Sequence, residues 1–121
     1  MAFKCERLIV WQRSLDLCQE INSLTKTFPK DETFSLSLQL RKAADSVNLN
    51  IAEGCTGQSN QEFARFLGYS LRSAIEVVSC LFIAKRKGYL DEMTFSRFYH
   101  EYESLIKMIT RLRDSLTCAD S

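Results

Sequence analysis

Proline and glycine are scarce in this sequence, which has one proline and four glycines among 121 residues. Both residue types interrupt helices. Their scarcity, together with an apolar share of 45%, indicates a mostly helical, globular chain rather than a disordered one. The length suits a single domain, residues 1–121, whose core needs neither a disulfide nor a metal.

A charge of one sign is also lacking, because 16 basic residues are balanced by 15 acidic ones and the net charge is +1. Proteins that bind through phosphate contacts usually carry a basic excess, so we expect modest non-specific affinity for nucleic acid unless assembly gathers the positive residues. No apolar run reaches the roughly 18 residues of a membrane-spanning helix. No signal-peptide pattern opens the sequence either. We therefore expect a cytoplasmic protein with no membrane contact.

Motifs of catalysis and metal binding are missing as well. The single histidine, His100, has no Glu-x-x-His motif around it, so the ligand pattern of a di-iron bundle is absent. The sequence contains no G-x-S-x-G elbow, no P-loop and no G-x-G-x-x-G motif. We therefore expect a protein that is not an enzyme and that has no catalytic residue, cofactor or metal.

Closely spaced cysteine pairs do not occur. The five cysteines are odd in number and form no C-x-x-C motif, which gives no support to a zinc knuckle or a thioredoxin-like centre. Free, mostly buried thiols in a reducing cytosol are expected. The cysteines are Cys5, Cys18, Cys55, Cys80 and Cys118.

Four helical segments are what the sequence does contain. Apolar residues recur at helical spacing over residues 8–27, 34–53, 60–87 and 91–117, with short connections between the segments. Consecutive helices joined by short connections pack as antiparallel neighbours. The sequence therefore predicts an all-α, antiparallel up-down-up-down four-helix bundle.

Local signals predict where these helices begin and end. Gly54 and Gly88 are expected to end the second and third helices, because a residue without Cβ adopts the left-handed conformation at little cost. Glu62 completes a capping box at the start of the third helix. The N-cap residues expected for the second, third and fourth helices are Thr33, Ser59 and Asp91.

The third helix carries more apolar surface than one bundle needs. Besides its core stripe it has a second apolar row, about 100° around the helix axis. A bundle helix buries one stripe, and each buried apolar side chain contributes about 1.5–3 kcal/mol, so the second row predicts self-association. The row consists of Leu71, Ile75, Val78 and Phe82.

Six sequence segments carry a resemblance to a known family. They are LIVWQ at 8–12, LTKTFPKDETF at 24–34, QLRKAADSV at 39–47, NIAEG at 50–54, SNQEFARFL at 59–67 and KGYL at 87–90. In this combination the chain resembles the small bacterial four-helix-bundle proteins encoded in intervening sequences of 23S ribosomal RNA genes. The resemblance covers about residues 3–116. Asn48 departs from it, since a proline is common at this position, and so does Arg72, where a glycine is common.

The resemblance implies an up-down bundle, often assembled as a ring-shaped pentamer, with no assigned enzymatic activity. Similar accessory proteins of diversity-generating retroelements bind nucleic acid. The family signature also favours a structural polar network, with a contact at the centre of a ring as the alternative. The residues expected to form this network are Arg41, Ser46, Asn50 and Glu53.

Two functions from different classes follow. The leading hypothesis is a homo-oligomer that binds structured RNA or DNA through weak contacts repeated around a ring. Its alternative is a scaffold that docks another protein without nucleic acid, and a small-molecule pocket within the bundle is a third hypothesis. The residues expected to contact nucleic acid are Arg41, Lys42, Lys85, Arg86 and Lys87, although cations at a helix C-terminus also stabilise the helix dipole by about 0.3–1 kcal/mol each.

Overall fold

The computed structural model describes the backbone of residues 3–120 and the side chains of residues 3–117. Within this part of the chain there is no β-strand. A short 3-10 helix, η1, precedes the first long helix, and a second one, η2, precedes the next. The elements are η1 Lys4–Arg7, α1 Ile9–Thr25, η2 Lys30–Glu32, α2 Leu36–Cys55, α3 Asn60–Arg86 and α4 Glu92–Asp120. The all-α prediction is thus confirmed.

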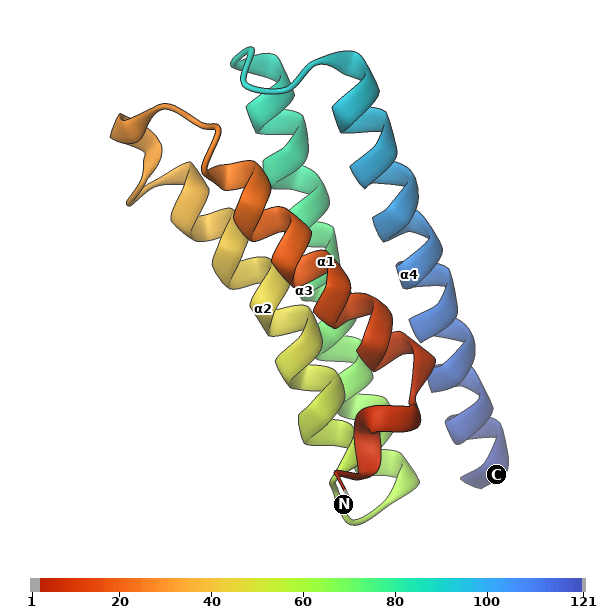
Figure 1. Ribbon diagram of the computed structural model, residues 1–121. Helices are drawn as coiled ribbons and strands as arrows, with labels where there is room; N and C mark the ends of the chain where they lie inside the picture. Colours follow the sequence, from red (N-terminus) through yellow and green to blue (C-terminus); the bar gives the residue numbers. More distant parts are fainter. Residues whose placement is uncertain (1–2, 121) are drawn as a thin grey trace.

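The four long helices run alternately up and down, so that each is antiparallel to the next (Figure 1). The most extensive contact joins α2 to α3, followed by α3 to α4 and α1 to α2, whereas α1 and α4 touch only lightly. The chain start and the α2–α3 connection lie at one end of the bundle, and the α3–α4 turn lies at the other (Figure 1). The arrangement confirms the antiparallel bundle.

Helix α3 supplies the centre of the core. Leu67, Val77 and Leu81 are fully buried, as are the small Ser70 and Ala74 between them. The Ser70 hydroxyl donates to the Val47 carbonyl of α2 over 2.8 Å, so the two helices approach closely there. By length and composition α3 is the one helix of the described chain that could span a membrane, with a mean hydropathy of 1.5 over its most apolar window. The core helix of a bundle has a similar composition, but only 33% of this window is buried, so its buried side chains account for part of the apolar composition alone.

Helix ends follow the expected caps in two places. The Glu62 amide donates to the Ser59 hydroxyl over 3.0 Å, and the Thr94 amide donates to the Asp91 carboxylate over 2.7 Å. The Glu62 carboxylate accepts from the Gln58 amide rather than from that of Ser59, so the capping box is displaced by one residue. These contacts satisfy donors that the first turn of a helix leaves open.

Gly88 adopts a φ of +82° and follows the last turn of α3, as expected. Gly54, in contrast, does not end α2, which continues to Cys55. A Cβ on Gly54 would lie 2.8 Å from the Phe63 ring and 3.0 Å from the Phe66 Cβ. The prediction was wrong because this glycine permits a close approach of α2 and α3 inside the helix.

The N-cap predicted for α2 was also wrong. Ser35, not Thr33, precedes the first residue of α2, and no side chain caps this helix in the usual manner. The Leu36 amide instead points to the Glu32 carboxylate, 3.4 Å away in η2. Glu32 is buried and belongs to a cluster at this end of the bundle, which the short 3-10 turn positions.

Candidate interaction surfaces

The basic run at the end of α3 uses much of its charge within the chain. The Lys85 ammonium lies 2.7 Å from the Glu92 carboxylate and 4.4 Å from the centre of the Phe95 ring. The Lys87 ammonium lies 2.8 Å from the Glu32 carboxylate. Arg86 is exposed and has no carboxylate partner among residues 3–117. Of the three cations, Arg86 is therefore the one left fully available to a partner.

Glu32 is the centre of a cluster that joins the two connections at this end. Its carboxylate accepts hydrogen bonds from Lys87 over 2.8 Å and from the Tyr89 hydroxyl over 2.7 Å. These bonds favour the ionised form, so Lys87 first and then Tyr89 lower the pKa of Glu32. The cluster ties η2 to the α3–α4 turn and has a structural role.

The two other basic candidates lie elsewhere on the molecule. Arg41 lines a groove between α1 and α2 together with Leu15 and Asp45, and its neighbour Lys42 is exposed. The run Lys85–Lys87 lines a different groove, beside Phe82 and Ile83. The structure therefore does not bring the five predicted nucleic-acid contacts into one site.

Half of the predicted polar network is present. The Asn50 amide donates to the Ser46 hydroxyl over 3.0 Å, and the Ser73 hydroxyl of α3 donates to the same oxygen over 2.9 Å. This chain of bonds links α2 to α3. The Arg41 and Glu53 side chains take no part in it, and among the described residues neither forms an ion pair.

The second apolar row of α3 divides into two parts. Leu71 is 8% exposed and belongs to the core of its own bundle, and Val78 packs partly against that core. Ile75 and Phe82 are 57% and 50% exposed, and Ile83 beside them is 45% exposed. The predicted contact face therefore narrows to Ile75 and Phe82, to which the structure adds Ile83.

A groove between α3 and α4 gathers three arginines. It has a volume of about 540 Å³, and no carboxylate lines it. Arg65 and Arg72 project from α3 and Arg113 from α4, above a floor that includes Ile75 and Ile106. Two of the arginines have an acidic neighbour that is not part of the groove lining: Glu62 lies 4.0 Å from Arg65, and Asp114 lies 3.6 Å from Arg113. Arg72 has no carboxylate partner among residues 3–117. We call this surface the arginine groove.

Of the cysteines whose side chains the structure describes, the two free ones, Cys18 and Cys80, offer no nucleophile at neutral pH. Burial, together with the nearby Asp45 carboxylate, raises the pKa of Cys18 to about 12. Burial likewise raises the pKa of Cys80. Because the thiolate is the reactive form, both side chains remain inert thiols. No group of three potential metal ligands occurs among the described residues.

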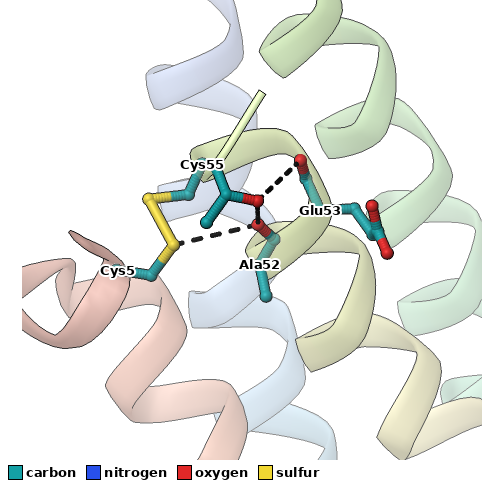
Figure 2. The surroundings of a disulfide bond; sticks show 5 residues. Cys5, Ala52, Glu53 and Cys55 are labelled. Carbon is teal, nitrogen blue, oxygen red and sulfur yellow. Dashed lines mark hydrogen bonds between the residues drawn. A yellow bond between two sulfur atoms is a disulfide. The ribbon is translucent and has the colours of Figure 1, made fainter. Parts of the chain in front are cut away.

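Two other cysteines are not free, and here the sequence prediction was wrong. Cys5 in η1 and Cys55 at the end of α2 form a disulfide across a separation of 50 residues, with their Cα atoms 5.9 Å apart. Figure 2 shows this bond beside Ala52, with the Glu53 carboxylate turned away from it. The spacing of cysteines along a chain does not reveal such a pair, because the two meet only after α1 and α2 have packed. The side chain of Cys118 lies outside the described residues.

Comparison with known proteins places the chain in a family. The profile of the family described as "23S rRNA-intervening sequence protein" matches residues 6–111. The chain belongs to this family. The structure is similar to that of a Bacteroides thetaiotaomicron protein described as of unknown function, from the S23 ribosomal protein family. The TM-score is 0.82 at 22% identity over 88% of this chain and 96% of that one, which supports the fold. No curated protein matches the chain.

Asn48, which stands where the family commonly has a proline, has a role that the sequence alone does not reveal. Its side-chain amide donates to the Ser14 hydroxyl over 3.0 Å and to the Trp11 carbonyl over 3.3 Å. These bonds join α2 to α1, and Ser14 and Asn48 are buried while Trp11 is partly buried. Asn48 therefore replaces the expected proline with an interhelical hydrogen bond.

The arginine groove is the functional candidate that sequence reasoning missed. Arg65 and Arg72 are both exposed on α3. The spacing of seven residues puts both on one side of the helix. Arg113 joins them only through the packing of α4, which the spacing within α3 does not show.

Proposed function

We propose that this intervening-sequence protein is a non-enzymatic, cytoplasmic homo-oligomer that binds structured RNA or DNA. The observation that carries the proposal is the exposed apolar surface of α3 beside the arginine groove. Ile75 borders both, so assembly and charge lie on adjoining surfaces of one helix pair. A single groove binds phosphate weakly, and several copies of it around a ring would together bind one nucleic acid more tightly. The assembly we favour is the pentamer implied by the family resemblance.

The electrostatic part of this function rests on arginines more than on lysines. Guanidinium groups bind phosphate oxygens through paired hydrogen bonds, which a lysine cannot do. Arg65, Arg72 and Arg113 line a groove without an acidic residue, whereas Lys85 and Lys87 already have carboxylate partners. We therefore assign the main phosphate contacts to the arginine groove, with Arg86, Arg41 and Lys42 as outlying contacts.

A mobility-shift titration with an RNA hairpin and a DNA duplex tests this function. The variant with Arg65→Glu, Arg72→Glu and Arg113→Glu should bind more weakly, and its slope of log affinity against log salt should be smaller by about 2–3, because each phosphate contact contributes about 0.9. The matched control is Arg86→Glu, which lies outside the groove and has no carboxylate partner among residues 3–117, and it should change the slope by about 1 at most. A wild-type protein that shifts neither probe at micromolar concentration would exclude nucleic-acid binding.

The second candidate function is a scaffold for another protein. It is favoured by the apolar floor of the arginine groove, which Leu71, Ile75 and Ile106 help to form. An amphipathic helix with acidic flanks has the complementary chemistry. Partners that remain bound in a cell extract after nuclease treatment, and that are lost on the triple arginine reversal, would favour this function over nucleic-acid binding.

A further inference from the structure

The segment before α1 has few contacts with the rest of the bundle. Helix η1 spans Lys4–Arg7 and lies against the start of α1 and the end of α2. The Gln12 side chain donates to the Glu6 carbonyl, and the Phe3 ring meets the Trp11 ring edge-on at 5.3 Å. The covalent link from Cys5 to Cys55 is therefore the strongest attachment of this segment. We call residues 3–7 the N-terminal arm.

The bundle core does not depend on the disulfide. The contiguous apolar core consists of side chains from α1 to α4 and the connections between them. Cys5 and Cys55 are buried as well, at 0% and 8% exposed, but they lie beside this contiguous core and not within it. A domain of 121 residues buries enough apolar surface to fold without a covalent crosslink. Opening the disulfide should therefore release the arm and leave the four helices packed.

We propose that Cys5 and Cys55 form a reversible redox clamp that fastens the N-terminal arm over Trp11 and the end of α2. In the oxidised protein the arm covers one side of the indole ring (Figure 2 shows the clamp itself). In the reduced protein the arm detaches and exposes Trp11 and the last turn of α2. This inference does not depend on nucleic-acid binding.

The chemistry requires only a small-molecule disulfide as oxidant. A thiolate of one cysteine attacks that disulfide and releases one small thiol, which leaves a mixed disulfide on the protein. The second cysteine then attacks the mixed disulfide, forms the Cys5–Cys55 bond and releases a second small thiol. Two electrons pass from the protein to the small disulfide, and the two thiol protons leave with the products. Excess small thiol reverses both steps.

The remaining described thiols do not compete for this exchange. The Cys18 thiol donates to the Ala44 carbonyl over 3.1 Å, and Cys80 is buried between helices. Burial favours the unreactive protonated form of both. Cys5 and Cys55 are buried too, but they differ from Cys18 and Cys80 in two ways. They lie within bonding distance of each other, and Cys5 belongs to the N-terminal arm, whose local opening exposes both sulfur atoms to a small thiol.

The test compares full-length protein equilibrated with oxidised or with reduced glutathione. Trypsin cleaves after Lys4 and Arg7 in the arm, and mass spectrometry after quenching and full reduction measures the loss of residues 1–7. Cleavage should be about tenfold faster or more in the reduced protein, because proteolysis follows the population of the opened segment. The emission of Trp11, the only tryptophan, should shift to longer wavelength while the helical circular dichroism stays unchanged.

Variants separate the clamp from a general effect of reduction. Cys5→Ser and Cys55→Ser should each cleave rapidly in both buffers, whereas Cys18→Ser should respond to glutathione like the wild type. Three results would overturn the proposal: no Cys5–Cys55 bond in oxidised glutathione, equal cleavage of the arm in both buffers, or loss of helical structure on reduction. The last would show a disulfide that holds the whole fold.

Discussion

The Lys87 ammonium lies 2.8 Å from the Glu32 carboxylate, across the end of the bundle that contains both short connections. The Tyr89 hydroxyl donates to the same carboxylate oxygen. Residues that are 55 and 57 positions from Glu32 in sequence thus fix the start of α2 against the end of α3. A basic run that resembles a phosphate site in the sequence is, at Lys87, part of the fold.

Glu32→Gln should lower the melting temperature at pH 7 and should remove an acid-sensitive part of the stability. The folded pKa of Glu32 is below its usual value of 4.5, so its contribution is fully present above that value and is lost as pH falls through the lower folded pKa. The melting temperatures of wild type and variant should therefore converge in acid. Glu101→Gln, which removes a more exposed ion pair with Arg13, should have a smaller effect at pH 7. A constant difference from pH 7 to pH 3 would contradict this role.

Two glycines inside helices should respond in opposite directions to alanine. Gly54→Ala places a Cβ against Phe63 and Phe66 and should destabilise the protein by about 1–3 kcal/mol, as overpacking does. Gly68→Ala meets no atom within 4 Å and should stabilise α3 by about 0.5–1 kcal/mol, because alanine loses less backbone entropy. Urea denaturation measures both. Equal effects at the two positions would show that α2 and α3 are not in close contact at Gly54.

The sequence determined the helices well because their signals are local. The third helix was expected at 60–87 and occupies Asn60–Arg86, since its apolar spacing and the cap at Ser59 lie within one segment. Gly54 was misjudged because its role depends on Phe63, which belongs to another helix. A glycine near the end of an apolar pattern is typical of a terminator, and the pattern alone does not distinguish that role from close helix packing.

The candidate sites were predicted less well because charge pairs and disulfides join residues that are distant in sequence and meet only in the tertiary structure. Nothing near Lys87 in sequence indicates Glu32, and nothing near Cys5 indicates Cys55. The exposure of Ile75 and Phe82 is consistent with the excess of apolar residues on α3, whereas Leu71 in the same row turns inward. Rotation of a helix by part of a turn moves a row between core and solvent, and this rotation is set by the neighbouring helices.

Removal of the Asn48 side chain should cost about 1–3 kcal/mol of unfolding free energy, because Asn48→Ala leaves the buried Ser14 hydroxyl with one partner fewer. Ser14→Ala should also be destabilising, because it removes the acceptor of the Asn48 amide and the donor of the 2.8 Å bond to the Trp11 carbonyl. The double variant should be more stable than the sum of the two changes implies, because the residues share one bond. Additive effects in urea denaturation would contradict a direct Asn48–Ser14 interaction.

Self-association through α3 should depend on Ile75 and Phe82. Light scattering of the wild type should report several times the 14.0 kDa chain mass, and Ile75→Glu or Phe82→Glu should reduce it, because a buried charge without a partner costs several kcal/mol at each interface. Leu49→Glu is the matched control, since Leu49 is an equally exposed apolar residue on α2. The mass of the Leu49→Glu variant measured by light scattering should stay at the wild-type value. The Phe82 ring also meets Phe95 at 4.8 Å, so circular dichroism must show that the variant keeps its helices. A wild-type monomer would exclude self-association. A Leu49 variant that dissociates while the two α3 variants do not would place the contact face outside α3.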